Sequence, residues 1–368
     1  MSGRDHHRKP YDEGTQDKLD LYRGYLREWI PVFLNSPNFS TINIFDFFAG
    51  PGTDVDGSPG SPVIANEEVC AALKQHGASK QEINLYFNEI AEGKYRDLTA
   101  WTAQQSPQNQ SVLFHTEQMD FSEVFQKWIK SAQKPQTANL LFLDQNGVKH
   151  VTAEVFNAIL RLKFTDFLFF ISSSIVNRFK EDDSIRRIVP VSDDDLKQMN
   201  GTNVHRIITD AYRRIVPPKM DYYIAPFSIK KDANVYGLIF GSHHPLGMDK
   251  FLRECWKKDE LRGEANFDID AEGINPSKPS LFSEMNKPQK LTQFEKELST
   301  AISKQQLNTN KDIYLFALNR GFLGKHAHKV IKELIETKQI PKQSLHISYD
   351  AWKKEETEPI RYAEKAQP

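Results

Sequence analysis

The chain has little cysteine, and it has no long apolar stretch. Of its 368 residues only two are cysteines, Cys70 and Cys255, and each lies within a helical pattern rather than in a Cys-x-x-Cys spacing. This usage argues against a zinc site and a disulfide framework, so we expect no metal and a reducing compartment. No apolar run reaches the length of a membrane span, and the polar residues 1–14 do not resemble a signal peptide. We therefore expect a cytoplasmic protein with no membrane partner.

Charge is unevenly distributed along the chain, although it almost cancels overall. The net charge is −1, yet the chain from residue 276 onward holds 16 lysines and arginines against 11 aspartates and glutamates. The preceding part holds 32 against 38. A basic C-terminal module on a mildly acidic body predicts contact with a polyanion such as nucleic acid at the C-terminal end. A solvated helical face would produce the same imbalance.

Apolar segments and helical patterns alternate through the first two thirds of the chain. An amphipathic helix over 15–34 comes first, and five strand–helix units and a hairpin of two strands follow it. Such units predict a parallel sheet with right-handed crossovers. An antiparallel last strand is characteristic of methyltransferases that use S-adenosylmethionine (SAM), so we expect an α/β, Rossmann-like methyltransferase sheet. The expected strands are 42–48, 83–88, 111–115, 139–143, 166–172, 221–229 and 234–241.

Composition changes after residue 262, where glycine, proline, serine and charged residues dominate. Three further helices are expected beyond this stretch, at 291–304, 310–320 and 324–337, with a short strand within 344–352. Three helices and a strand in such a short module predict a small winged helix-turn-helix domain. The full division is a flexible N-terminus (1–14), a Rossmann-like methyltransferase domain (15–262), a linker (263–290), a winged-helix domain (291–354) and a loose tail (355–368).

The most informative stretch is residues 42–62, INIFDFFAGPGTDVDGSPGSP. A strand ends in Asp46 and a glycine turn, and Ser61 and Pro62 then open a helix. A P-loop is excluded because Ser58-Pro59 stand where Lys and Ser/Thr are required. A dinucleotide fingerprint fits poorly, because the acids in the loop would repel a pyrophosphate. A cationic cofactor, SAM, suits an acidic strand end beside glycines, although an ordinary glycine-rich surface loop has a similar composition.

In a doubly wound sheet the ligand lies at the carboxyl ends of the strands, so the residues that follow each strand are the candidates. Glu89 follows the second strand and is placed to accept both ribose hydroxyls. Asp120 follows the third strand and is placed to receive the adenine amino group, with Phe121 packing nearby. Each acid also suits a helix cap. The complete set expected to bind the cofactor is Asp46, Phe48, Ala49, Gly50, Pro51, Gly52, Glu89, Asp120 and Phe121.

Asp144, Gln145 and Asn146 follow the fourth strand, where amino-methyltransferases place their catalytic loop. There a carboxylate and a carbonyl hold the target amine so that its lone pair faces the methyl group. The usual loop is Asp/Asn-Pro-Pro-aromatic, whose aromatic ring stacks on a flipped base. In this chain the middle positions are Gln and Asn and the aromatic is missing. Both cysteines are expected within helices, which excludes the loop cysteine that cytosine C5 methylation needs.

A second candidate site lies in the C-terminal module, on the helix expected over 324–337. A recognition helix presents basic side chains to phosphates and base edges. Winged helices also bind proteins, and that alternative stays open. The residues expected to contact nucleic acid are Lys325, His326, His328, Lys329 and Lys332.

Several of these segments together resemble one known family. They are the run FDFFAGPG…DG-PGSP, the D-x-x-G loop at 144–147, FGSHHPLG at 240–247 and the winged-helix tail. Over about residues 15–345 the chain resembles the three-Cys-motif partner proteins of bacteria. The resemblance implies a methyltransferase-like fold, SAM and a three-Cys-motif protein as partner. The family's usual Asp-Pro-aromatic-Gly is Asp144-Gln145-Asn146-Gly147 in this chain, which departs at its two middle positions.

Three readings of function follow from this sequence. The first is a SAM-dependent methyltransferase that modifies an amino or ring nitrogen of nucleic acid, with Asp144 orienting the target. The second is a catalytically weak or inactive partner or scaffold protein acting with a three-Cys-motif protein, which the changed loop at 145–146 favours. The third is methylation of a protein or a small molecule.

Overall fold

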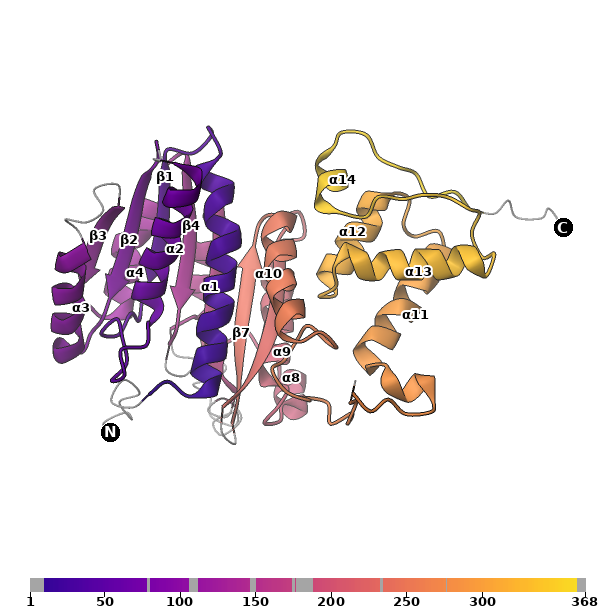
Figure 1. The fold of residues 1–368 in the computed structure, drawn as a ribbon, viewed down its shortest axis with the longest axis horizontal. Coiled ribbons are helices and arrows are strands. Elements are labelled where there is room, and N and C mark those ends of the chain that lie inside the picture. The colour runs from indigo at the N-terminus through magenta and orange to yellow at the C-terminus, as the bar shows by residue number, and fades with distance from the viewer. Residues whose placement is uncertain are drawn as a thin grey trace. The chain divides into compact units, whose positions relative to one another are not determined.

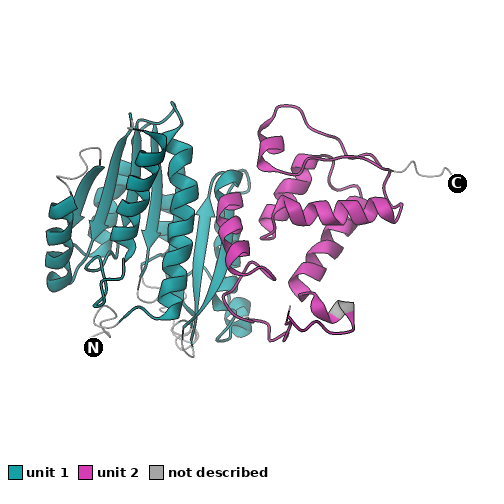
Figure 2. Cartoon of the chain, viewed as in Figure 1, with its two compact units in different colours: residues 1–247 teal, residues 248–368 magenta. Residues whose placement is uncertain are grey.

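The computed structural model of the chain describes residues 10–77, 80–105, 112–145, 150–173, 176, 188–231, 234–275 and 277–362. The chain divides into two compact units, Met1–Gly247 and Met248–Pro368, which Figure 2 shows in different colours. The first unit contains a single mixed sheet covered by helices, and the second is helical (Figure 1). No helix in the described part of the chain is both long enough and apolar enough to cross a membrane.

The sheet has seven strands in the order β3-β2-β1-β4-β5-β7-β6. Strands β1 to β5 run parallel, whereas β7 lies antiparallel between β5 and β6. The expected Rossmann-like sheet with a closing hairpin is therefore confirmed. The chain builds outward from β1 to β3 and then returns to β4, so the strand order reverses between β1 and β4. The strands are β1 Thr41–Asp46, β2 Glu82–Asn88, β3 Val112–Glu117, β4 Thr137–Leu143, β5 Thr165–Ser172, β6 Tyr223–Lys231 and β7 Asn234–Ser242.

Helices cover both faces of this sheet. On one face α1 and α2 lie side by side (Figure 1), and Arg23 and Arg27 of α1 both bond the carboxylate of Glu68 in α2. α1 begins two residues earlier than expected because the side chain of Asp12 accepts the Thr15 N–H and caps it. The helices of this unit are α1 Glu13–Leu34, α2 Ser61–His76, α3 Glu92–Gln105, α4 Phe121–Ala132, α5 Ala153–Leu160, α8 Asp193–Gln198 and α9 Val204–Ile215, and α10 Pro245–Lys258 begins at its end.

The alternation of side chains along the strands separates two cores. Phe45 of β1 and Phe47, the residue just after this strand, point to one face and pack among aromatic residues such as Trp128. Ile44 and Asp46 point to the opposite face, together with Phe142 of β4, on which Tyr22 of α1 stacks at 4.2 Å between ring centroids. Because side chains alternate along a strand, a charged residue at its end lies on the α1 face only if it is an even number of positions from Ile44 in β1 or from Phe142 in β4.

The C-terminal unit is a small helical domain with its own core. Phe294 and Phe322 stack with ring centroids 4.0 Å apart, and Trp256 lies against the ring of His326. Part of the expected linker is folded, because Arg262 forms ion pairs with Asp268 and Glu272. The elements are the 3-10 helix Ser283–Asn286 and helices α11 Gln289–Ser303, α12 Asn310–Asn319, α13 Gly324–Glu336 and α14 Tyr349–Lys353.

One expected element of this unit is wrong. The short strand expected within 344–352 is replaced by helix α14, which Ser348 caps by accepting the Ala351 N–H at 3.3 Å. Buried Ala351 lies in this helix, whereas buried Ile347 lies before the Ser348 cap, in a segment that forms neither helix nor strand. In the part of this unit that the structure describes, the β pairing is a single isolated bridge between Thr309 and Pro359.

Candidate functional site

Two carboxylates lie close together where the strand order reverses. Asp46 is the last residue of β1 and pairs in register with Phe142 of β4. Asp144 is two residues beyond Phe142, so its side chain projects from the same face of the sheet, the face that α1 covers. The electrostatic influence of Asp144 on Asp46 confirms this proximity. Open α/β sheets bind ligands at such a reversal, outside the carboxyl ends of the strands.

Asp46 is fully buried but incompletely hydrogen-bonded. Its side chain has no solvent exposure, and its Oδ1 atom accepts the Phe48 N–H at 3.1 Å. Its Oδ2 atom has no partner among the described residues, and neither has the buried hydroxyl of Tyr22, which feels the charge of Asp46. Burial raises the pKa of Asp46 to about 7, although the Ser61 hydroxyl and the Phe48 N–H favour its charged form. A buried acceptor without a partner is unusual and indicates a place for a ligand donor.

The glycine turn beside Asp46 adopts backbone conformations that favour glycine. Gly50 and Gly52 have φ of 65° and 102°, in the left-handed region. The turn closes on itself where the Gly60 N–H donates to the Gly52 carbonyl at 2.7 Å. A Cβ atom at Gly60 would lie 2.8 Å from that carbonyl oxygen and 2.9 Å from the Tyr11 hydroxyl. The loop therefore needs glycines for both its shape and its contact with the N-terminal segment.

Glu89 joins the end of β2 to the glycine turn. Its two carboxylate oxygens accept the Gly50 N–H at 3.1 Å and the Ala91 N–H at 2.7 Å. Neighbouring Asn88 was missed by the sequence analysis, and it ties together three strand ends. Its amide donates to the carbonyls of Phe47 and Met119 and accepts the Met119 N–H. The expected residues Gly50 and Glu89 are thus in direct contact.

The carboxylate of Asp54 stabilises its own loop by accepting backbone N–H groups. Its carboxylate accepts the N–H groups of Asp56 and Ser58 at 3.0 and 2.8 Å, and also that of Tyr11 at 2.8 Å. The acids that argued against a pyrophosphate thus include one that fastens the N-terminal segment over the glycine turn. The sequence pattern offered no signal for that contact, because Tyr11 and Asp54 are far apart in the chain.

The expected adenine side of the site lies beyond β3, where two aromatic rings and a histidine meet. Phe121 stacks on Phe48 with centroids 5.4 Å apart, and the ring of His150 lies 5.2 Å from Phe48 and 5.0 Å from Phe121. Asp120 is exposed and caps α4 by accepting the N–H and hydroxyl of Ser122. Both functions suggested for Asp120, capping and ligand contact, are compatible with this position. His150 was not predicted.

The three residues expected after β4 have different environments. Asp144 forms an ion pair with Lys18 of α1, and its side chain is 23% exposed. Gln145 is buried, with its carbonyl oxygen accepting the His150 N–H at 2.9 Å and its amide nitrogen unpartnered among the described residues. Asn146 lies outside the described residues. Of this set, only Asp144 is shown to lie beside Asp46.

The N-terminal segment and α1 add three side chains that the sequence analysis missed, Tyr11, Lys18 and Tyr22. The Tyr11 hydroxyl feels the charges of Asp54, Asp144 and Asp46, which together with burial raise its pKa. A signal was present, because Lys18 and Tyr22 are four residues apart on the helix face that continues to Tyr25 and Trp29. A lysine on an otherwise apolar buried face is a candidate for a specific ion pair.

On α13 the structure separates the basic residues expected to meet nucleic acid. Lys325, Lys329 and Lys332 are exposed. His326 is buried, and its ring accepts the Leu323 N–H at 3.0 Å. Burial lowers the pKa of His326 to about 4, with nearby Lys325 and Lys329 acting in the same direction. This side chain packs in the core of the unit and is not placed to contact a phosphate. The exposed ring of His328 accepts the Ile347 N–H.

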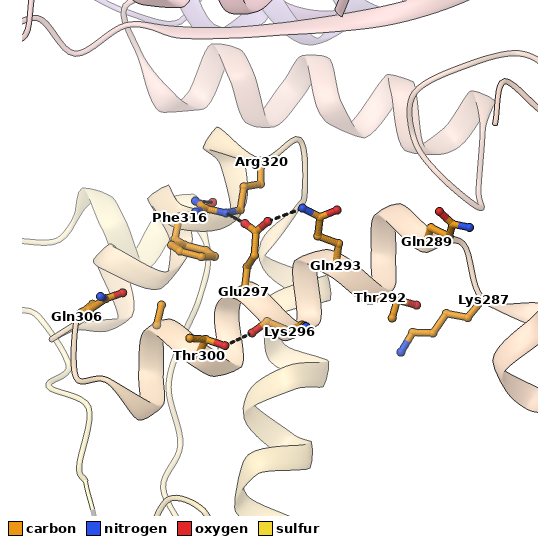
Figure 3. A pocket seen from close by; sticks show the side chains of 11 residues that line it. Lys287, Gln289, Thr292, Gln293, Lys296, Glu297, Thr300, Gln306, Phe316 and Arg320 are labelled. Carbon is orange, nitrogen blue, oxygen red and sulfur yellow. Dashed lines mark hydrogen bonds and ion pairs between the residues drawn. The ribbon is translucent and has the colours of Figure 1, made fainter. Parts of the chain in front are cut away.

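A separate open pocket of about 960 Å³ lies along α11 and α12 (Figure 3). Arg320 stacks on Phe316, 3.4 Å from the ring centroid, and bonds Glu297, which also accepts the amide of Gln293. The charged groups in this part of the pocket therefore satisfy one another, in contrast to the unpartnered oxygen of Asp46. The described residues contain no cluster of three or more His, Cys, Asp and Glu side chains that could hold a metal ion.

Comparison with known proteins identifies the second unit more specifically than the first. Residues 266–344 match the family model of the GMT-like wHTH domain, so this part of the chain is a winged helix-turn-helix domain. No curated protein sequence matches the chain. Solved structures similar to it include the DszA carbon methyltransferase, with 14% identity and a TM-score of 0.34 over 63% of this chain and 55% of that one.

Two further solved structures show similarity of the same kind. The O-methyltransferase TomG of Streptomyces achromogenes, solved with SAM, has 10% identity and a TM-score of 0.32, covering 63% of this chain and 89% of its own. An O-methyltransferase from Klebsiella pneumoniae also has 10% identity and a TM-score of 0.32, covering 63% and 90%. Similarity at this level does not identify an activity or a substrate.

Proposed function

We propose that this protein binds SAM at the carboxyl edge of β1 and β4 and uses it to methylate a nitrogen atom of nucleic acid. The observation that carries the proposal is Asp46, a fully buried carboxylate with an unpartnered oxygen, beside a glycine turn at the reversal of strand order. A cationic donor, such as the ammonium group of SAM, satisfies that oxygen and favours the charged form of the acid.

The charges of the site fit this cofactor better than they fit an anionic one. SAM carries a sulfonium, an ammonium and one carboxylate, so its net charge is positive. Asp46 and Asp144 lie near the ammonium group of Lys18, and Asp54 adds a further carboxylate in the glycine loop, so the acids outnumber the cation among these residues. A nucleotide phosphate at the same place would meet these carboxylates unfavourably.

Each part of the predicted cofactor site has a physical role. Asp46 holds the ammonium group, while the glycine turn from Phe48 to Gly52 lets the backbone approach the ligand closely. Glu89, already oriented by the Gly50 and Ala91 amides, accepts the ribose hydroxyls. The rings of Phe48 and Phe121 offer an apolar surface near the adenine, and Asp120 lies exposed at the start of α4.

Bound SAM supplies an activated methyl group, and this chain supplies position and electrostatics. Asp144 accepts an N–H of the target, so that the nitrogen lone pair is directed at the methyl group. The winged-helix domain, with exposed Lys325, Lys329 and Lys332, holds the nucleic acid through its phosphates. The roles of Gln145 and Asn146 stay predictions, with Gln145 supporting the loop through the His150 N–H.

The test has two stages. Calorimetric titration with SAM should show binding by the wild-type chain and its loss in Asp46→Ala. Transfer of labelled methyl groups to pools of DNA and RNA should then require Asp144. Asp144→Ala should still bind SAM, although less tightly because Lys18 is then unbalanced, and it should lose turnover. Failure of the wild-type chain to bind SAM would refute the proposal.

The second reading of the sequence predicts a different pattern of results. A partner or scaffold protein would bind SAM, or bind nothing, and transfer no methyl group to DNA or RNA. The Gln-Asn pair at 145–146, in place of the resemblance family's Pro-aromatic, is the feature that favours it. Adding a three-Cys-motif protein to the same assay separates an incomplete enzyme from an inactive one.

A further inference from the structure

Lys18 is an unusual residue for the buried face of an amphipathic helix. It lies in the second turn of α1, its side chain is 9% exposed, and its ammonium group is ion-paired with Asp144 Oδ2. The same ammonium lies 4.7 Å from the centroid of the Phe170 ring, which belongs to β5. Lys18 therefore reaches the carboxyl ends of β4 and β5, on the side of Asp46 away from β2.

Stability alone is a poor explanation for this ion pair. Removing an ammonium and a carboxylate from water costs several kcal/mol per ion, and their attraction often does no more than offset that cost. An apolar side chain at position 18 would continue the packing surface of Tyr22, Tyr25 and Trp29. A lysine retained in this place indicates a function for its charge.

Only one of the two carboxylate oxygens of Asp144 is bonded to Lys18. Lys18 bonds the Oδ2 atom, and the Oδ1 atom has no hydrogen-bond partner in the described part of the chain. Asp144 remains 23% exposed, so its free oxygen can meet a bound molecule. Asp46 is influenced by both members of the pair, which places all three groups in one electrostatic unit.

We propose that Lys18 is a positioning residue for methyl transfer, which balances the charge of Asp144 next to the sulfonium and holds that carboxylate with one oxygen directed at the acceptor. This inference rests on the proposed function. An unbalanced carboxylate beside a sulfonium stabilises the charged reactant more than the transition state, in which that charge is being dispersed. Lys18 removes this penalty and keeps Asp144 available to accept an acceptor N–H.

The inference makes a prediction that needs no turnover assay. SAM carries a sulfonium, whereas S-adenosylhomocysteine has a neutral thioether and is otherwise alike. In Lys18→Met the unbalanced Asp144 should favour SAM over S-adenosylhomocysteine by roughly tenfold more than in the wild type, the effect of one charge in a partly buried site. Asp144→Asn should shift the ratio of the two dissociation constants in the opposite direction, because Lys18 is then unbalanced.

The experiment is calorimetric titration of the full chain with each ligand, using the wild type, Lys18→Met, Asp144→Asn and the double variant. The double variant should return the ratio towards the wild-type value. Lys74→Met is the matched control, because exposed Lys74 is in the last turn of α2, about 20 Å along that helix from Ser61. The control should leave the ratio unchanged.

The outcomes separate this inference from the proposed function. If the wild type binds both ligands and neither single variant changes their ratio, the role of Lys18 is refuted while the cofactor site stands. Equal weakening of both ligands in Lys18→Met would also refute it, because that pattern indicates a structural ion pair. If the wild type binds neither ligand, the proposed function fails and the inference fails with it.

Discussion

Two buried aspartates on the same face of the sheet differ in how they are satisfied. Asp166 is the second residue of β5, near its amino end, and its Oδ2 atom accepts the Tyr25 hydroxyl at 2.6 Å. Asp46 is the last residue of β1, at its carboxyl end, and its Oδ2 atom has no partner in the described part of the chain. Burial raises the pKa of both, to about 6 for Asp166 and about 7 for Asp46.

The difference indicates what each acid is for. Buried polar groups are normally bonded within the protein, and Asp166 follows that rule because its Oδ2 atom accepts the Tyr25 hydroxyl. Asp46 breaks the rule at the edge of the sheet where α/β proteins bind their ligands. The Oδ2 atom of Asp166, near the amino end of its strand, has a donor within the protein, whereas that of Asp46, at the carboxyl end, has none among the described residues. We attribute the difference to a ligand that supplies the donor for Asp46.

Replacing each aspartate with asparagine should produce the largest difference between the two, measured as the change in affinity for SAM. Asp46→Asn removes the charge that holds the cofactor ammonium, and we expect the free energy of SAM binding to weaken by about 1.5–3 kcal/mol, the value of a hydrogen bond to a charged group. Asp166→Asn should leave SAM affinity unchanged. Calorimetric titration of both variants measures this. Equal losses of affinity in the two variants would contradict the assignment.

The pH dependence should also differ between the two acids. Because the pKa of free Asp46 is raised to about 7, the acid is mostly protonated at pH 6, and binding a cation requires it to ionise. SAM affinity should therefore rise by roughly tenfold between pH 6 and pH 7.5 in the wild type, and this rise should disappear in Asp46→Asn.

The same shift predicts how the stability of the ligand-free protein changes. An acid with a raised pKa in the folded state ionises first in the unfolded state, so it lowers stability progressively between about pH 4 and pH 7. Chemical denaturation of the wild type and Asp46→Asn across that range tests this. Parallel stability curves for the two proteins would contradict the environment described for Asp46.

Removing a partner of Asp166 should affect stability rather than binding. Tyr25→Phe deletes the hydroxyl that donates to the buried carboxylate, and we expect a loss of about 1–3 kcal/mol in the free energy of unfolding. Under conditions in which the variant is fully folded, its affinity for SAM should equal that of the wild type. Urea denaturation and calorimetry measure the two quantities. A tenfold loss of affinity with normal stability would show that Asp166 belongs to the ligand site.

The fold could be predicted from the sequence because its signals are local. Apolar runs such as NLLFL and alternating helical patterns specify elements individually, and a closing hairpin 221–241 specifies an antiparallel last strand. The strand-end acids could be predicted too, because parallel strands end at a common edge. Asp46 pairs with Phe142, and Asp144 is two residues further along, so both side chains lie on the sheet face that α1 covers.

Contacts between distant segments could not be predicted in this way. Tyr11 meets Asp54 and Lys18 meets Asp144 only because α1 packs across the sheet, and no short-range pattern reports that packing. The burial of His326 was missed for the same reason, since the sequence places it among the basic residues at the start of α13 and does not show that Trp256 packs against its ring. The prediction of a strand within 344–352 was wrong because Ser348 caps the short helix α14 inside that stretch.

The second unit repeats the contrast on a smaller scale, with a partnered histidine beside exposed lysines. Lys329→Ala should weaken nucleic-acid binding modestly and reduce the slope of log affinity against log salt by about one. Lys74→Ala, on α2, is the matched control for loss of one positive charge. Filter binding over a salt series measures both. An unchanged slope for Lys329→Ala would remove this residue from the proposed contact.

The most direct test of the central claim is the number of protons released when SAM binds at pH 6.5, measured by calorimetry in buffers of different ionisation enthalpy. The account predicts release of about three quarters of a proton by the wild type and by Asp166→Asn, because a carboxyl group with a pKa of about 7 is protonated to that extent at pH 6.5. It predicts no release by Asp46→Asn. Binding without proton release in the wild type, or release that persists in Asp46→Asn, would contradict the claim that Asp46 ionises to bind the ammonium group of SAM.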